Sequence, residues 1–242
     1  MTVGLVLLAR APFVRVGSVH PRVFGRLFAV PLSPSTPLFL HACCGPCSLE
    51  PVRALQDEGY ALTLCYVNPN IQPQDEYERR LVTLREWAAS MAIEVIAAPY
   101  DAKAWEREVA PWGTNRPARC AACYRLRLRE AARMASDRGF VRLSTTLAVS
   151  PYQLFEVCGH ELEMACGEQG LEPVWRDFRP YYPQATTRAK ELGLYRQNYC
   201  GCRFSAAEAA LERTEAREDR RRGRDEERAA GRTMVMMPHN QG

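Results

Sequence analysis

From about residue 37, short apolar runs alternate along the chain with longer stretches in which apolar residues recur at helical spacing. The apolar runs are typical of buried strands, and the spaced stretches are typical of amphipathic helices. Strands are predicted at residues 38–42, 62–67, 93–97, 141–144 and 173–175. Helices are predicted at residues 48–59, 74–91, 123–138, 151–170 and 186–193, with a short additional helix capped by Asp101. This alternation predicts an α/β fold in which helices cover both faces of a parallel sheet.

Two flanking segments differ in composition from this core. Residues 1–36 contain arginines and several prolines but no acidic residue, and we expect them to form a poorly ordered extension. Residues 206–242 are rich in Ala, Glu and Arg, which predicts a charged, solvated helix that frays toward its end. Fold and function are therefore assigned to a domain spanning residues 37–205.

Composition and charge narrow the class of protein. A chain of 242 residues that is 47% hydrophobic is long enough to bury one sizeable core. Its formal net charge of +4 permits a polyanionic partner such as RNA without requiring one. The apolar run at residues 4–9 is far too short to span a bilayer, and no membrane partner is expected. Many cysteines without a secretory signal indicate a reducing, cytoplasmic location.

Most of the ten cysteines stand in tight groups, which are Cys43, Cys44 and Cys47; Cys120 and Cys123; and Cys200 and Cys202. In an open parallel sheet, reactive groups gather at the carboxyl ends of the strands, where loops lead into helix N-termini. Cys43 and Cys44 follow the first strand, and Cys120 and Cys123 are expected at the start of the helix 123–138. Because helix N-termini lower thiol pKa values, the two groups predict one shared site of four thiolates.

The spacing of the cysteines leaves several chemistries open. Adjacent Cys43 and Cys44 disfavour a tetrahedral zinc site, which stays as one alternative. The sequence Cys44-Gly-Pro-Cys47 matches the thioredoxin tetrapeptide, so a thiol–disulfide oxidoreductase is the main competing interpretation. The Cys200-Gly-Cys202 pair fits a strained, reducible disulfide as well as it fits two further metal ligands or two free thiols. A plain packing role is expected for Cys65, Cys158 and Cys166.

Five segments of the chain form a recognisable set of motifs. They are Leu40–Ser48 (LHACCGPCS), Tyr66–Ile71 (YVNPNI), Glu76–Arg80 (EYERR), Cys120–Arg127 (CAACYRLR) and Arg196–Cys202 (RQNYCGC). Together they resemble the QueH family of epoxyqueuosine reductases. The similarity runs from about residue 38 to residue 205. Five motifs in the order of the family are far more specific than one Cys-X-X-Cys sequence, and they outweigh the thioredoxin interpretation.

The resemblance implies a fold like that of the nucleotide α-hydrolases and N-type ATP pyrophosphatases, with the phosphate loop given over to metal binding and no ATP as cofactor. It implies conversion of the epoxide of epoxyqueuosine in tRNA to queuosine, with a [4Fe-4S] cluster, a nearby second iron and an unidentified electron donor. By position, the cluster ligands would be Cys43, Cys44, Cys120 and Cys123. The redox-active pair would be Cys200 and Cys202, and Cys47 lies where it would bind the second iron.

Residues of other types near these motifs are candidates for binding the substrate. Asn68 and Asn70 follow the second strand and would hydrogen-bond the base or ribose, although a turn explains asparagine there equally well. Arg125 and Arg129 are spaced four apart, which suits contacts to tRNA phosphates or a solvated helix face. Tyr152 is a candidate for stacking on a base. The proton donor is left unassigned among Asp101, Tyr77 and Tyr199.

Overall fold

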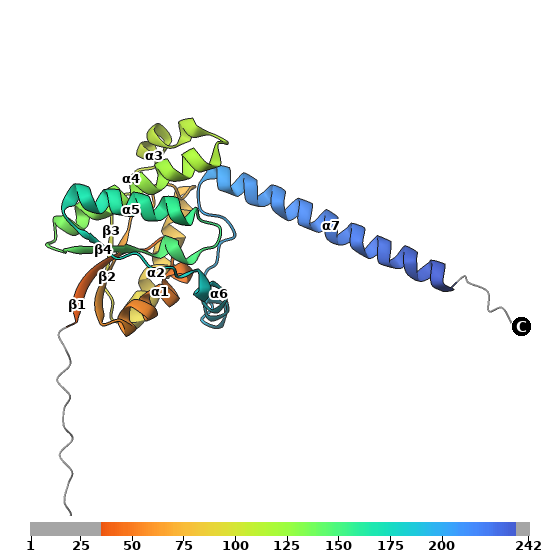
Figure 1. The fold of residues 1–242 in the computed structure, drawn as a ribbon, viewed down its shortest axis with the longest axis horizontal. Helices are drawn as coiled ribbons and strands as arrows, with labels where there is room; N and C mark the ends of the chain where they lie inside the picture. The colour runs from red at the N-terminus through yellow and green to blue at the C-terminus, as the bar shows by residue number, and fades with distance from the viewer. Residues whose placement is uncertain (1–34, 236–242) are drawn as a thin grey trace, which may run out of the picture. The chain divides into compact units, whose positions relative to one another are not determined.

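Five parallel strands form the centre of the computed structural model, which describes residues 35–235 of the chain (Figure 1). The strands are β1 (Thr36–His41), β2 (Tyr60–Tyr66), β3 (Val95–Ala97), β4 (Arg142–Thr145) and β5 (Glu172–Pro173). Their order in the sheet is β3-β2-β1-β4-β5, and each pair of neighbours is parallel. The predicted parallel sheet is confirmed, and its strand order is that of the doubly wound nucleotide-binding folds.

The connections between the strands are helical, as predicted. The helices are α1 (Gly45–Asp57), α2 (Gln74–Ser90), α3 (Ala102–Glu108), α4 (Arg116–Ser136), α5 (Phe155–Gln169), α6 (Tyr182–Glu191) and α7 (Arg203–Val235). Short 3-10 turns lie at Ala110–Trp112, Thr146–Val149 and Arg179–Tyr181. Asp101 caps α3, because its side chain accepts a hydrogen bond of 2.9 Å from the backbone N–H of Ala104.

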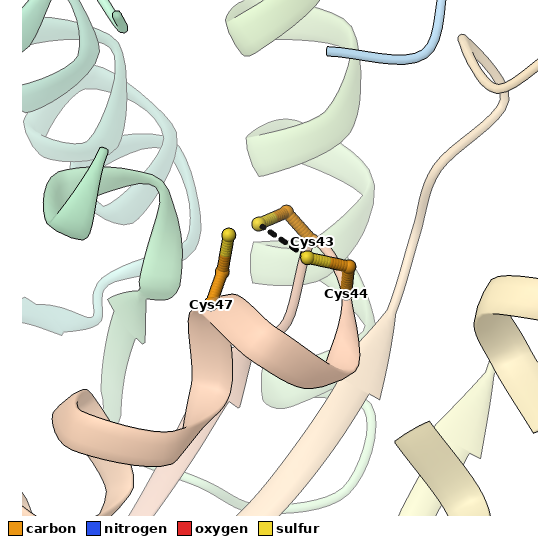
Figure 2. Close-up of side chains that lie close together, drawn as sticks. All are labelled: Cys43, Cys44 and Cys47. Atoms are coloured by element: carbon orange, nitrogen blue, oxygen red, sulfur yellow. Dashed lines mark hydrogen bonds between the residues drawn. The ribbon is translucent and has the colours of Figure 1, made fainter. Parts of the chain in front are cut away.

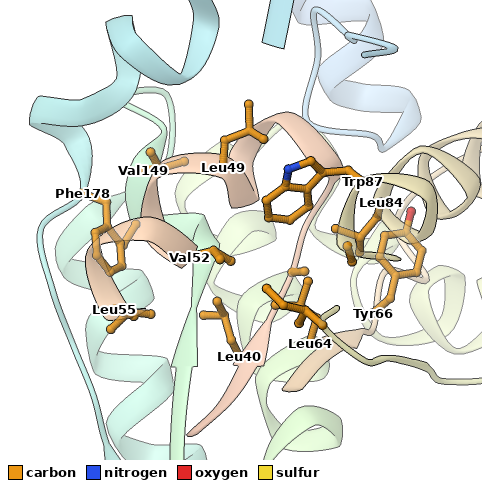
Figure 3. Close-up of a cluster of buried hydrophobic side chains, with 14 of the residues drawn as sticks. Leu40, Leu49, Val52, Leu55, Leu64, Tyr66, Leu84, Trp87, Val149 and Phe178 are labelled. Carbon is orange, nitrogen blue, oxygen red and sulfur yellow. The ribbon is translucent and has the colours of Figure 1, made fainter. Parts of the chain in front are cut away.

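Successive side chains of each strand point to opposite faces of the sheet. Because both faces carry apolar side chains, helices cover both of them. On β1, Leu38 and Leu40 face a buried cluster formed with α1 and α2, part of which is drawn in Figure 3. Phe39 points the other way, into a second cluster with Leu128 of α4 and Leu162 of α5. The core therefore lies in two layers, and both faces of the sheet are buried as the sequence predicts.

Helices α1 and α4 both begin earlier than predicted, and these two differences affect the cysteines. Helix α1 begins at Gly45, so that Cys44 is its N-cap residue with an extended backbone. Helix α4 begins at Arg116 because Asn115 caps it and a proline is tolerated in its first turn. Cys120 and Cys123 consequently lie inside α4. The expectation that they occupy a helix N-terminus was wrong.

The elements at both ends of the described region begin slightly before their predicted positions. Most of the predicted extension, residues 1–34, lies outside the described residues, whereas Thr36 already pairs with Tyr60 in β1. The predicted C-terminal helix exists and starts at Arg203. Its first turns contact the rest of the domain, since Glu208 forms an ion pair of 2.7 Å with Arg119. None of the helices within residues 35–235 is long and apolar enough to cross a membrane.

Candidate active site

Three thiols lie together at the carboxyl end of β1. The sulfur atoms of Cys43, Cys44 and Cys47 are all within 4.8 Å of one another, and Figure 2 shows them pointing toward a common point. The loop is held in place by Thr146, whose hydroxyl accepts the N–H of Cys43 at 3.0 Å and donates to its sulfur at 3.4 Å. Soft sulfur ligands at this spacing suit iron, copper or zinc rather than hard metal ions.

The three thiols differ in how readily they ionise. Hydrogen bonds from Cys43 and Cys47 hold the pKa of Cys44 well below its usual range, and the positive charge of Arg80 acts in the same direction. Sharing a proton with Cys44 raises the pKa of Cys43 to about 11, and hydrogen bonds with Cys43 and Cys44 raise the pKa of Cys47. Gln197 donates a hydrogen bond of 2.9 Å to the sulfur of Cys44. Cys44 is therefore the favoured thiolate of the group.

The second cysteine pair, on α4, has a different environment. Cys123 is buried, and the half-buried Cys120 packs against the same apolar cluster as Cys43. Burial raises the pKa of Cys120 to about 11 and that of Cys123 to about 12. Burial therefore raises both pKa values, whereas the sequence predicted that they would be lowered. Among the described residues, neither sulfur joins the group of three within 4.8 Å.

The loop that carries Cys200 and Cys202 returns to the same region of the molecule. Arg80 donates a hydrogen bond of 3.0 Å to the backbone carbonyl of Cys200, which anchors the loop on α2. Cys202 is buried in a small cluster that also contains Cys123 and Trp105, whereas Cys200 is exposed. The loop therefore lies between α2 and α4, and it brings the third cysteine group near the other two.

Gly201 allows this loop to lie flat on the turn that follows β2. Its φ angle of 141° lies in a region that side chains rarely adopt, and a Cβ atom there would be 2.8 Å from Ile71. The backbone carbonyl of Gly201 accepts a hydrogen bond of 3.0 Å from the N–H of Gln72. The glycine between the two cysteines is therefore a geometric requirement of this packing.

Two buried arginines lie near the thiols, and neither is among the site residues predicted from the sequence. Arg80 forms a 2.7 Å ion pair with Glu76 and lies over the ring of Tyr199. Arg127 donates to the carbonyl of Val67 and to the side chain of Asn68. Each guanidinium has one buried nitrogen without a hydrogen-bond partner. Both lie within motif segments quoted above, and that position was the only available signal.

A buried histidine joins the strand ends beneath the thiols. His41 Nε2 donates to the carbonyl of Val67 at 3.2 Å, and its Nδ1 accepts from the hydroxyl of Thr145 at 2.8 Å. Burial lowers the pKa of His41 to about 3, so the ring is neutral near pH 7. It fixes the carboxyl ends of β1, β2 and β4 relative to one another.

The two candidate asparagines are both buried but differ in their contacts. Asn68 donates a hydrogen bond of 3.0 Å to the carbonyl of Ala42 and accepts one from Arg127. Its side chain is therefore used within the protein. The Oδ1 atom of Asn70 is buried without a partner and remains available as an acceptor.

The candidate tRNA-binding side chains also differ from one another. Arg125 forms an ion pair of 2.7 Å with Glu161, and Arg129 pairs with Glu168 at 2.5 Å, so both positive charges are locally balanced. Tyr152 is 66% exposed and meets the ring of Tyr182 edge-on, with 6.0 Å between the ring centroids. Of these candidates, Tyr152 offers the most accessible surface.

The three candidate proton donors all have structural partners. The carboxylate of Asp101 caps α3 as described above. The hydroxyl of Tyr77 donates to the carbonyl of Ala98 at 3.2 Å, and that of Tyr199 donates to the carbonyl of Gln72 at 3.3 Å. The geometry does not favour any one of them as the acid.

Comparison with known proteins identifies the family. The family model described as "Epoxyqueuosine reductase QueH" matches residues 38–208, a region that contains all three cysteine groups and both buried arginines. The chain belongs to the QueH family. QueH proteins are named as reductases, so this chain is an oxidoreductase. With this match and an all-parallel sheet, the thioredoxin-like interpretation of Cys44–Cys47 is set aside.

Several curated relatives carry the name epoxyqueuosine reductase QueH. The protein from Dehalococcoides mccartyi is 33% identical over 172 residues, which cover 71% of this chain and 93% of the relative. The protein from Thermotoga maritima is 31% identical, covering 71% of this chain and 91% of the relative. That from Haemophilus influenzae is 30% identical, covering 69% and 71%.

A solved structure also aligns with this QueH chain. It is titled as a predicted subunit of tRNA methyltransferase from Methanocaldococcus jannaschii. The alignment covers 64% of this chain and 75% of that one, with 14% sequence identity and a TM-score of 0.47.

Proposed function

We propose that this protein reduces the epoxide of epoxyqueuosine in tRNA to the alkene of queuosine. In this reaction the epoxide oxygen leaves as water, a carbon–carbon double bond forms, and two electrons and two protons are consumed. The proposal is supported by one observation above all: a chain of the QueH family gathers three cysteine groups and two buried arginines in one region. A site that only bound RNA would need no such collection of thiols.

The residues present fit an iron–sulfur cofactor. We propose that Cys43, Cys44, Cys120 and Cys123 bind a [4Fe-4S] cluster and that Cys47 binds an adjacent iron. An all-sulfur donor set is typical of iron–sulfur clusters, and thiolate-bound clusters do not require their ligands to touch. The partnerless guanidinium nitrogens of Arg80 and Arg127 favour an anionic group beside them. When bound, the cluster would transfer single electrons and the adjacent iron would provide a Lewis acid.

The proposal has no role for ATP. Cys43 and Cys44 occupy the loop after β1, the position at which nucleotide-binding folds of this strand order hold phosphate. The pKa of Cys44 is lowered, so this thiol tends to carry a negative charge. A negative charge at this position would repel phosphate oxygens. The protein therefore uses this position for redox chemistry rather than for nucleotide binding.

Cys200 and Cys202 are the proposed redox-active pair. Two thiols that join in a disulfide release two electrons and two protons, which is the amount that the removal of one epoxide oxygen as water consumes. A further reductant, either a dithiol or an electron-transfer protein, must then reduce the disulfide before the next turnover. The exposure of Cys200 supports access for such a donor.

Tyr152 is the proposed stacking partner for a base of the tRNA, because it is exposed and follows β4 at the carboxyl end of the sheet. Asn70 is proposed to hydrogen-bond the nucleoside. Phosphate contacts by Arg125 and Arg129 would require tRNA to compete with their ion pairs.

The variant Tyr152→Ala should bind tRNA about tenfold more weakly than the wild type, because it loses the stacking ring. The variant Tyr152→Phe keeps the ring and should bind tRNA with wild-type affinity. Equal affinities of the two variants in a fluorescence anisotropy titration would count against stacking.

The proposed function is tested by anaerobic purification followed by assays for iron, sulfide and zinc. We expect about five irons and four sulfides per chain, with broad visible absorption that dithionite bleaches. The same protein, given tRNA containing epoxyqueuosine and a reductant, should yield queuosine detectable by mass spectrometry of the digested tRNA. Zinc, or no metal, in protein never exposed to air would overturn the proposal.

A further inference from the structure

Arg127 is a buried cation that lacks a buried anion among the described residues. Its exposed fraction is 1%, and it lies one helical turn after Cys123 on α4. Its hydrogen bonds go to two neutral acceptors, the carbonyl of Val67 and the side chain of Asn68, while Nη1 has no partner. Within residues 35–235 no carboxylate lies at ion-pair distance from it. A charge removed from water in this way requires compensation from something nearby.

The other fully buried arginines show what ordinary compensation looks like in this protein. Arg80 has Glu76 at 2.7 Å, and Arg119 has Glu208 at the same distance. Arg127 has no such carboxylate in the described part of the chain, and thiols lie around it instead. Those thiols are Cys123, Cys200 and Cys43, one from each cysteine group. Arg127 therefore faces the centre of the proposed site instead of a carboxylate.

Arg127 also joins the elements that carry the thiols. Its partner Asn68 donates a hydrogen bond of 3.0 Å to the carbonyl of Ala42, the residue before Cys43. Its other partner, the carbonyl of Val67, also accepts the hydrogen bond of His41. Through these bonds one side chain of α4 is connected to the loops that follow β1 and β2.

We propose that Arg127 is a positioning residue that supplies the counter-charge of the cysteine site and makes the group bound there easier to reduce. The inference rests on the proposed function, because it assumes that a reducible iron–sulfur group occupies the site. An added electron increases the negative charge of that group, and a fixed buried cation stabilises the reduced form more than the oxidised form. Solvent salt screens such a buried interaction only weakly.

The test compares the reduction potential of the cluster in four variants of the full-length, anaerobically purified protein. Arg127→Gln removes the buried charge. Asn68→Asp keeps Arg127 and places a carboxylate beside its guanidinium. Arg127→Lys keeps the charge. Arg125→Gln is the matched control, because it removes an exposed arginine from the same helix. Circular dichroism and iron and sulfide content establish that each variant is folded and loaded.

At the midpoint potential of the wild type, we expect the ratio of reduced to oxidised cluster to fall at least tenfold in Arg127→Gln and Asn68→Asp. For a one-electron couple this is a shift of about 59 mV to more negative potential. Arg127→Lys and Arg125→Gln should change the ratio less than threefold. Loaded Arg127→Gln and Asn68→Asp proteins with wild-type potentials would overturn the role of Arg127 alone. A wild type without iron and sulfide would instead overturn the proposed function, and this inference with it.

Discussion

Two groups of thiols in this chain have contrasting chemical environments. Cys43, Cys44 and Cys47 exchange hydrogen bonds with one another, so that proton sharing decides which of them ionises. Cys65 and Cys166 are fully buried in the apolar layer between the sheet and its covering helices. In that layer a thiol has the properties of a small apolar side chain. The sequence predicted this packing role, because Cys65 lies within a predicted buried strand and Cys166 lies on a predicted helix.

The burial of Cys166 predicts an alkaline loss of stability. Burial raises its pKa to about 12, whereas an unfolded thiol ionises near pH 9. Between those values the unfolded state has lost a proton that the folded state keeps, so the free energy of unfolding falls as the pH rises. The contribution of the Cys166 thiol to the free energy of unfolding is fully present below about pH 9. Above about pH 9 it is lost at up to about 1.4 kcal/mol per pH unit.

Urea titrations of metal-free protein at pH 8, 9, 10 and 11 test this contribution. The variant Cys166→Ala should be less stable than the wild type at pH 8 because it leaves a small cavity. Its stability should then fall less steeply with pH. Parallel pH profiles of the wild type and the variant would show that the Cys166 thiol does not titrate as described.

Replacing either member of the redox pair should separate turnover from cofactor binding. Because a serine hydroxyl cannot form a disulfide, Cys200→Ser and Cys202→Ser should each lower the multiple-turnover rate at least tenfold. Iron and sulfide contents should stay near wild type, because neither residue is a proposed cluster ligand. Cys166→Ala is the control for a generic cysteine loss. Full multiple-turnover activity in either serine variant would remove the pair from the mechanism.

At the scale of elements, the loop 196–202 depends on one glycine. Gly201→Ala forces a Cβ atom against Ile71 and imposes strain at a positive φ, so the loop should shift from its place beside α2. We expect turnover to fall at least tenfold while the melting temperature changes by only a few degrees, since the loop is local. Gly167→Ala on α5, where a Cβ atom meets nothing within 4 Å, should leave activity unchanged. Wild-type activity in Gly201→Ala would show that the loop tolerates displacement.

The elements also show where sequence reasoning succeeded and where it failed. Strands and amphipathic helices were predictable because their apolar residues recur locally, as in the alternating Leu38, Phe39 and Leu40. The first two turns of α4 were missed because they contain few large apolar residues. Arg119, in those turns, is stabilised by Glu208 of α7, which is 89 positions away in the chain. Long-range partners of this kind leave no periodic pattern.

The absence of a sequence pattern for long-range partners also explains the wrong predictions at the candidate site. The motifs identified which cysteines to examine, but not that Cys120 and Cys123 lie inside a buried stretch of helix. Arg125 and Arg129 suggested a basic stripe because their acidic partners are on another helix, 36 and 39 positions away. Local spacing can indicate that a residue is on a helix face, but it cannot indicate what packs on that face.

At the scale of the whole molecule, α7 has two parts with different expected effects. Phe204 packs with Trp105 of α3, and Glu208 pairs with Arg119, whereas Leu211 is already 65% exposed. Ending the chain after Leu211 should leave the melting temperature within about 2 °C of wild type. Ending it after Cys202 should lower it by several degrees, since buried contacts and an ion pair of a buried arginine are lost. Differential scanning calorimetry distinguishes the two truncations, and equal melting temperatures would contradict this division.

The strand order β3-β2-β1-β4-β5 also constrains how the protein is made in the cell. Because the chain leaves the ribosome from its N-terminus, the thiols after β1 emerge long before those of α4, and the loop with Cys200 and Cys202 emerges last. A nascent chain therefore exposes Cys43, Cys44 and Cys47 while the residues that complete their surroundings are still being synthesised. The complete set of thiols can therefore come together only after residue 202 has left the ribosome.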